Sequence, residues 1–259
     1  MAKFAPQYNL FKIIDKLDFI NRIIFWMILL LSIVPVLFKE ICDHQNLLNI
    51  INIVNMIGIS SFFMVEVIND LILIPQANSK RRDDFIDNSF GSNFSPNNSV
   101  EYYDNEEVGR GLYKAAVNLF ENCFFTYSLV RATTIRKIIT PSVMVLFVIV
   151  FSYYGFQEVP YALSVLQALF SANILGLLVK HLILFNRLST IQDSWIVLFQ
   201  QEDLKANTFK YQSSIYRYWL QYETLHSKMN MSIPESVFKK LNTPLTEEWK
   251  KLKVKYKIS

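Results

Sequence analysis

Four long apolar segments constrain this chain more than any other feature of its sequence. They cover Ile23–Phe38, Leu47–Val65, Ile138–Phe156 and Val159–Val179. An α-helix rises ~1.5 Å per residue, so roughly 20 residues cross a hydrocarbon core of ~30 Å. Each segment is about that long, the first with help from its apolar neighbours. The sequence therefore predicts an all-α integral membrane protein with four transmembrane helices in two hairpins.

The charged residues divide the chain between these segments. Hydrophobic residues make up 52% of the sequence and charged residues 19%, which is more apolar than a typical soluble domain. Charges concentrate between and after the apolar pairs. We therefore expect five regions: a cytosolic amphipathic segment at 1–22, a first hairpin at 23–76, a cytosolic loop and helix at 77–137, a second hairpin at 138–186 and a cytosolic helical tail at 187–259.

Lysine and arginine predict the orientation, because they accumulate in the cytosolic flanks of transmembrane helices. They are frequent before the first segment, between the second and third, and after the fourth. The connection between the first two segments offers only Lys39, and the hairpin Gly155–Tyr161 has no lysine or arginine. Both termini and the central region are therefore expected in the cytosol.

The cytosolic regions have helical patterns. Apolar residues recur at helical spacing from Gly111 to Arg131, which predicts an amphipathic helix. The stretch Asp87–Asn105 is rich in Asn, Ser and Gly and predicts a loop. Thr243-Pro244 has the cap and first-turn proline that predict the start of a further helix.

Polar residues in the second segment form the main candidate site inside the membrane. At ~100° per residue, Asn52, Asn55, Glu66 and Asp70 fall within about 60° of one another on a helix. In the fourth segment, Gln167 shares a face with two serines. These five residues would line a water-filled, cation-favouring conduit if several chains assemble. Alternatively, the amides form hydrogen bonds between packed helices, at about 0.6–2 kcal/mol each.

The sequence contains few signs of an enzyme. The three histidines are scattered without metal-ligand spacing, and no phosphate-binding glycine loop is present. We therefore expect no enzyme activity, no cofactor and no metal site. The net charge of +4 is too small and too widely spread to indicate nucleic-acid binding.

A basic cluster follows the second apolar segment. Lys80, Arg81 and Arg82, with the nearby Asp87 and Phe90, are candidates for binding a signal or a partner, since the bases suit nucleotide phosphates or lipid headgroups. The same cluster is also what the cytosolic flank of a transmembrane helix normally looks like.

The order of these parts resembles the bacterial S-4TM family of pore-forming effectors, as a divergent member or a sister group. The resemblance covers nearly the whole chain. It is most specific at Lys80–Gly91, at Asn118–Asn122, and in the closing run from Lys239-Lys240-Leu241-Asn242 to Glu247-Glu248-Trp249.

The resemblance implies an antiviral-defence role in the bacterial inner membrane, beside a partner that detects infection. The expected function is an effector that forms homo-oligomers in the lipid bilayer and permeabilises it. The expected trigger is a cytosolic defence partner or a nucleotide second messenger. The alternative is a membrane anchor or scaffold that recruits a cytosolic partner without conducting ions.

Overall fold

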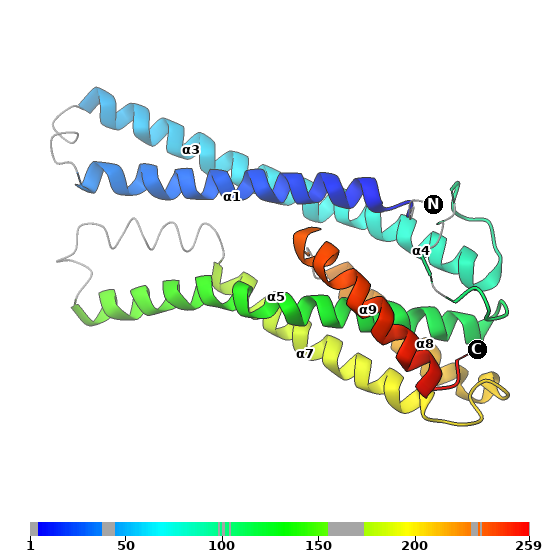
Figure 1. The fold of residues 1–259 in the computed structure, drawn as a ribbon. Coiled ribbons are helices and arrows are strands. Elements are labelled where there is room, and N and C mark those ends of the chain that lie inside the picture. Colours follow the sequence, from blue (N-terminus) through cyan, green and yellow to red (C-terminus); the bar gives the residue numbers. More distant parts are fainter. Residues whose placement is uncertain are drawn as a thin grey trace. The chain divides into compact units, whose positions relative to one another are not determined.

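The computed structural model describes residues 5–37, 45–97, 99, 102–103, 105–154, 174–228, 233 and 235–258. Within this part of the chain the secondary structure is entirely helical (Figure 1). The elements are α1 (Tyr8–Leu37), α3 (Gln45–Ile68), the π-helix η1 (Asn69–Leu73), α4 (Ile74–Phe90), α5 (Leu112–Tyr154), α7 (Ile174–Phe199), the 3₁₀-helix η2 (Thr208–Tyr211), α8 (Gln212–Lys228) and α9 (Glu235–Lys255).

The second apolar segment lies in the longest helical run that meets the requirements of a membrane span. Among the residues that could be searched, Asn46–Phe90 is the one helix long and apolar enough to cross a bilayer, and only 17% of its most apolar window is buried. The run contains η1, a turn wider than an α-helix. Pro75 stands at the start of α4. It has no N–H to donate and its ring crowds the preceding turn, which accounts for the wide turn just before it.

Two boundaries differ from those expected from the sequence. The helix α4 continues to Phe90, so the predicted loop begins only at Gly91. Pro244 does not start a new helix but lies inside α9, which is continuous from Glu235 to Lys255. The helix predicted at Gly111–Arg131 is present as the first half of α5.

The chain folds as two compact units, which are described separately. The apolar unit comprises residues 13–72 and 135–181, and the polar-core unit comprises residues 1–12, 73–134 and 182–259. One of these boundaries, at 72/73, falls inside η1.

In the apolar unit, α1 and α3 run side by side (Figure 1). They lie close together at Gly58, where a Cβ atom would lie 3.1 Å from Cγ1 of Ile28. Among the residues of this unit whose burial the structure describes, the large apolar side chains that are buried are Ile14, Ile28 and Phe62. Many others are exposed over 57–68% of their surface, including Leu30, Ile50, Met56, Ile57 and Leu146.

The polar-core unit has a conventional aromatic core. The ring of Phe120 on α5 stacks on Phe199 of α7, with 4.8 Å between centroids, and meets Trp249 of α9 edge-on at 5.3 Å. Trp195 and Trp249 are completely buried. Helix α4 contacts α8. The core thus ties α4, α5, α7, α8 and α9 together around a set of polar side chains that form the candidate site.

Candidate functional site

The basic cluster of α4 does not present all of its charges to solvent. Lys80 is exposed and Arg82 half-buried, but Arg81 is buried. The Arg81 guanidinium donates to Oε2 of Glu223 on α8 at 2.6 Å, and their side chains are only 7% and 13% exposed. It also lies over the Tyr222 ring, 5.8 Å from the centroid. Arg81 therefore serves the α4–α8 contact inside the protein, and of the cluster only Lys80 and Arg82 are left for an external ligand.

Charge and burial oppose one another at this ion pair. Burial lowers the pKa of Arg81, but the carboxylate of Glu223 more than offsets this effect, so the pKa lies above its ordinary value. Burial and the Arg81 charge together hold the pKa of His226 well below the ordinary value of 6.5. His226 Nε2 lies 2.9 Å from the Tyr222 hydroxyl, which is also 2.9 Å from Thr126 Oγ1. A neutral histidine and a permanently charged arginine thus share one buried site.

Asp87 holds the loop that follows α4. Its carboxylate accepts the backbone N–H groups of Phe94 at 2.8 Å and Ser95 at 2.7 Å. Burial raises the pKa of Asp87, but these two donors outweigh it and leave the pKa below its ordinary value. One turn earlier, Asp84 accepts the N–H of Ser99 at 2.6 Å. Asp87 is therefore a structural residue of the loop, while Phe90 stays 40% exposed.

A network of buried amides continues from this loop into α5. Asn105 donates to Oδ1 of Asn118 at 2.9 Å and to Oε2 of Glu121 at 2.6 Å. Its own Oδ1 accepts the indole N–H of Trp249 at 3.3 Å. Asn105 and Asn118 are completely buried. The network therefore joins the loop, α5 and α9 through buried side chains that form hydrogen bonds with one another.

Asn118 carries the network back to α4. Its Nδ2 donates to Oδ1 of Asn88 at 2.9 Å and to Oγ of Ser89 at 3.1 Å. Helix α4 ends directly after these residues, and its C-terminal cap is Gly91, whose φ of 75° lies in the left-handed region. A Cβ atom at this position would lie 2.7 Å from an Arg110 nitrogen. The Lys80–Gly91 and Asn118–Asn122 stretches that carry the family resemblance are thus in direct contact.

The candidate conduit residues of the second apolar segment lie in α3 and η1 and differ in exposure. Asn52 and Asp70 are exposed, whereas Asn55 and Glu66 are half-buried. Gln167 lies outside the described residues. A polar pair that the sequence reading did not single out joins the α1 and η1 segments of the apolar unit: Asn69 Nδ2 donates to Oδ1 of Asp18 at 2.8 Å.

The site consists of hydrogen-bonding and ionic groups. Among the residues that the structure describes, no three His, Cys, Asp or Glu side chains are grouped so that they could hold a metal ion. Glu223 and Asn105, which are central to the site, have no sequence motif around them. The sequence offers only one signal: Asn105 ends the predicted loop, and Trp249 belongs to the closing run that resembles the family. Chemically, the arrangement can fix the position of α4 and respond to changes in charge.

No family model matches the chain, and no curated protein and no solved structure is significantly similar to it.

Proposed function

We propose that this protein is a membrane effector that assembles in the bilayer and permeabilises it when a cytosolic signal or partner acts on its polar-core unit. The observation that carries this proposal is the surface of the apolar unit. Apolar side chains such as Leu30, Met56 and Leu146 are exposed over 60% or more of their area. Soluble proteins rarely expose so many large apolar side chains, whereas lipid chains can cover them. In this proposal the four apolar segments span the inner membrane, with both termini in the cytosol.

The exposed polar residues of α3 favour assembly over a solitary chain. Asn52 is exposed on a helix whose other exposed side chains are largely apolar, such as Ile50 and Ile53. An amide that faces hydrocarbon lacks partners, and a second copy of the chain or a water-filled path would supply them. Asp70, also exposed, would add a negative charge near the cytosolic mouth of that path.

The π-helix η1 gives the proposal a coupling element. One of the boundaries between the two units falls within η1, and the chain continues from there into α4. Wide π-turns often occur at functional sites, because they accommodate an extra residue that can be redistributed. A signal that shifts α4 would then be passed along the helix to α3.

Dye leakage tests the proposal directly. The protein is reconstituted in liposomes loaded with a self-quenching dye, and release is followed with and without lysate from infected cells. Glu66→Gln removes a charge and keeps the shape, so a cation path should lose selectivity while cross-linked oligomers persist. Glu248→Gln, an exposed change on α9, is the matched control. Absence of leakage under every condition would refute the proposal.

Thiol labelling tests the topology. A cysteine at position 157 should react with an impermeant reagent in intact spheroplasts, and a cysteine at position 97 should not. Labelling at 97 in sealed cells would reverse the orientation and remove the cytosolic signal from the proposal.

A specific contact favours the non-conducting anchor as a second candidate. The hydrogen bond from Asn69 to Asp18 shows that a polar side chain of this region joins two helices of the same chain. If Asn52 and Asn55 serve the same purpose, replacing both by Leu should weaken assembly and leave no conductance to lose. Unchanged ion flux in Glu66→Gln together with lost assembly in Asn52→Leu/Asn55→Leu would favour the anchor.

A further inference from the structure

Helix α4 is fastened to α8 by contacts that follow one another along both helices. The ring of Phe85 meets Trp219 edge-on, with 5.2 Å between the ring centroids. One turn back on α4, the Arg81 guanidinium forms its ion pair with Glu223, which lies one turn further along α8. The partner positions fall on α4 as they rise on α8, so the facing sides of the two helices run antiparallel.

A histidine completes this series of contacts. Nδ2 of Asn78, one turn before Arg81, donates to the backbone carbonyl of His226 at 3.3 Å. The His226 ring lies against Tyr222, with 4.7 Å between the ring centroids, and its Nε2 is 2.9 Å from the Tyr222 hydroxyl. The residue as a whole is only half-buried, so protons can reach it from solvent. We call this set of side chains the α4–α8 clamp: Asn78, Arg81 and Phe85 on α4, and Trp219, Tyr222, Glu223 and His226 on α8.

The charges around His226 are uneven. The positive charge that acts on it is that of Arg81, whose guanidinium lies 5.8 Å from the centroid of the neighbouring Tyr222 ring. The clamp contains one carboxylate, Glu223, and Arg81 already engages it at 2.6 Å. Burial raises the pKa of Tyr222 and also that of Cys123 on α5, so both groups stay neutral. A proton on His226 would therefore place a second positive charge beside Arg81, without a second carboxylate in the clamp to offset it.

These surroundings make proton uptake depend on whether α4 is held against α8. Burial, and then the charge of Arg81, keep the pKa of His226 well below 6.5 in the held state. A histidine in solvent has a pKa of about 6.5. Well above that pH the imidazole is neutral in both states, and below it only the released state binds the proton, so acid favours release. Between pH 7.5 and pH 5.5, this residue alone should raise the ratio of released to held α4 about tenfold.

We propose that the α4–α8 clamp is a proton-sensitive latch, in which proton uptake by His226 favours release of α4 from α8. The plain alternative is that His226 only supplies a neutral hydrogen-bonding group near the end of α8. The latch is inferred from contacts within the polar-core unit alone. Its consequence rests on the function proposed above: a leak of protons through the inner membrane would acidify the cytosol and release α4 in further copies of the protein.

Hydrogen exchange measures the release of α4. The full chain is exchanged in neutral detergent micelles at pH 7.5 and pH 5.5, and the protection of each backbone amide is corrected for the intrinsic effect of pH on exchange. Over this range, protection at positions 78–85 should fall about tenfold more in wild type than in His226→Gln. The glutamine can still bond to the Tyr222 hydroxyl but cannot gain a charge. His181→Gln, the same substitution outside the clamp, should behave as wild type does.

Asp84, on α4 itself, acts in the opposite direction. Burial raises the pKa of Asp84, so the held state binds a proton here more readily than the released state, and a falling pH stabilises the held state through this group. Asp84 is present in both wild type and His226→Gln. The difference between the two proteins therefore isolates the histidine.

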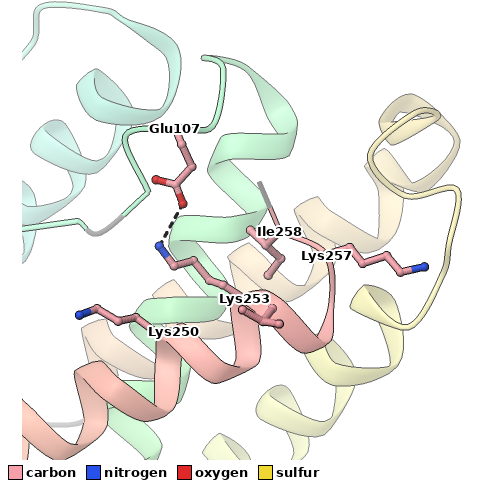
Figure 2. A pocket seen from close by; sticks show the side chains of 6 residues that line it. Glu107, Lys250, Lys253, Lys257 and Ile258 are labelled. Carbon is pink, nitrogen blue, oxygen red and sulfur yellow. Dashed lines mark hydrogen bonds and ion pairs between the residues drawn. The ribbon is translucent and has the colours of Figure 1, made fainter.

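The end of α9 is an internal control within the same protein. Figure 2 shows the Lys253 ammonium directed at the Glu107 carboxylate, at a distance of 3.0 Å. Burial raises the pKa of Glu107, but its own backbone N–H and the ammonium groups of Lys253 and Lys114 outweigh burial and leave the pKa lower than usual. This carboxylate stays ionised at both pH values, so protection at positions 249–255 should not change between them.

Two results would overturn the latch. If His226→Gln loses as much protection at positions 78–85 as wild type does, the histidine does not sense the pH. If protection at positions 249–255 falls as steeply as at 78–85, acid loosens the whole unit and not α4 in particular. Should His226→Gln fail to fold, this second comparison, made within wild type, still decides. Exchange requires neither a bilayer nor a trigger, so failure of the latch and failure of permeabilisation are separate results.

Discussion

Removing Glu223 should destabilise the polar-core unit more than any change in the exposed part of the basic cluster. Arg81 is buried, and the carboxylate of Glu223, 2.6 Å away, neutralises its charge. The arginine cannot lose its proton at any ordinary pH, so Glu223→Ala leaves an uncompensated charge in the interior. Breaking a buried ion pair in this way costs about 3–5 kcal/mol. Since both side chains are almost fully covered, at 7% and 13% exposure, solvent screening gives little relief.

Thermal unfolding of the purified protein measures this effect. For chains of this size, each kcal/mol corresponds to roughly 2–4 °C, so Glu223→Ala should lower Tm by about 6–20 °C. Arg82→Ala, at the neighbouring half-buried arginine, is the matched control and should change stability by no more than ~0.5 kcal/mol. Replacing both partners by apolar residues, in Arg81→Met/Glu223→Leu, should restore most of the loss, because no charge is left unpaired.

Two results would refute this reasoning. If Glu223→Ala unfolds at the same temperature as Arg82→Ala, the ion pair does not stabilise the fold. If Arg81→Met/Glu223→Leu loses as much as the two single changes added together, the residues act independently. The same physics changes how an Arg81→Ala/Arg82→Ala variant should be interpreted: loss of activity would follow from loosening of α4 and would not identify a ligand.

The remaining predictions concern the rest of the polar core. Gly91→Ala should destabilise the protein by about 1–2 kcal/mol in chemical unfolding, because φ 75° is strained for alanine and the new Cβ meets Arg110, whereas Gly109→Ala has open space around it and should be neutral. Asn118→Ala should cost about 1–3 kcal/mol for each buried partner left unsatisfied; an unchanged Tm would mean that the network carries no stability. Because the pKa of His226 is lower when folded than its unfolded value near 6.5, the unfolded chain takes up a proton first as pH falls below 6.5, so stability should decline there by up to ~1.4 kcal/mol per pH unit. His226→Gln should remove this part of the slope between pH 7 and pH 5.5.

Hydrophobic periodicity predicted the helices well and their ends less well. The apolar segment within α3 and the amphipathic half of α5 both have strong patterns, and both are helices. Pro244 was misread because a proline in the first turn and one in the interior have the same local signature. An interior proline costs about 3 kcal/mol. Burial of Leu245 and Trp249 beside it offsets that cost, and this burial depends on the rest of the fold.

The roles of Arg81 and Asp87 could not be predicted from local sequence for a different reason. Ala77, Asn78, Arg81, Asp84 and Phe85 are all buried, and their spacing is that of the inward face of a helix. Apolar periodicity alone would place the three polar residues of this stripe, Asn78, Arg81 and Asp84, on the protein surface. The residues that neutralise Arg81 lie more than a hundred positions away on α8, so neither composition nor spacing connects them.

The polar stripe of α4 also suggests how the effector proposed above would be held inactive before it is triggered. Apolar residues of similar shape would pack at least as stably as a buried ion pair, so stability alone does not explain why Arg81 and Glu223 stand there. What a polar core adds is dependence on charge and on hydrogen-bond direction, because each group left without its partner costs about 1–3 kcal/mol. A helix held by such side chains stays in place until one of its ionic or hydrogen-bonding partner groups is altered, and several of its contacts are then lost together. Helix α4 is joined through η1 to α3, the helix for which we propose a role in membrane permeabilisation.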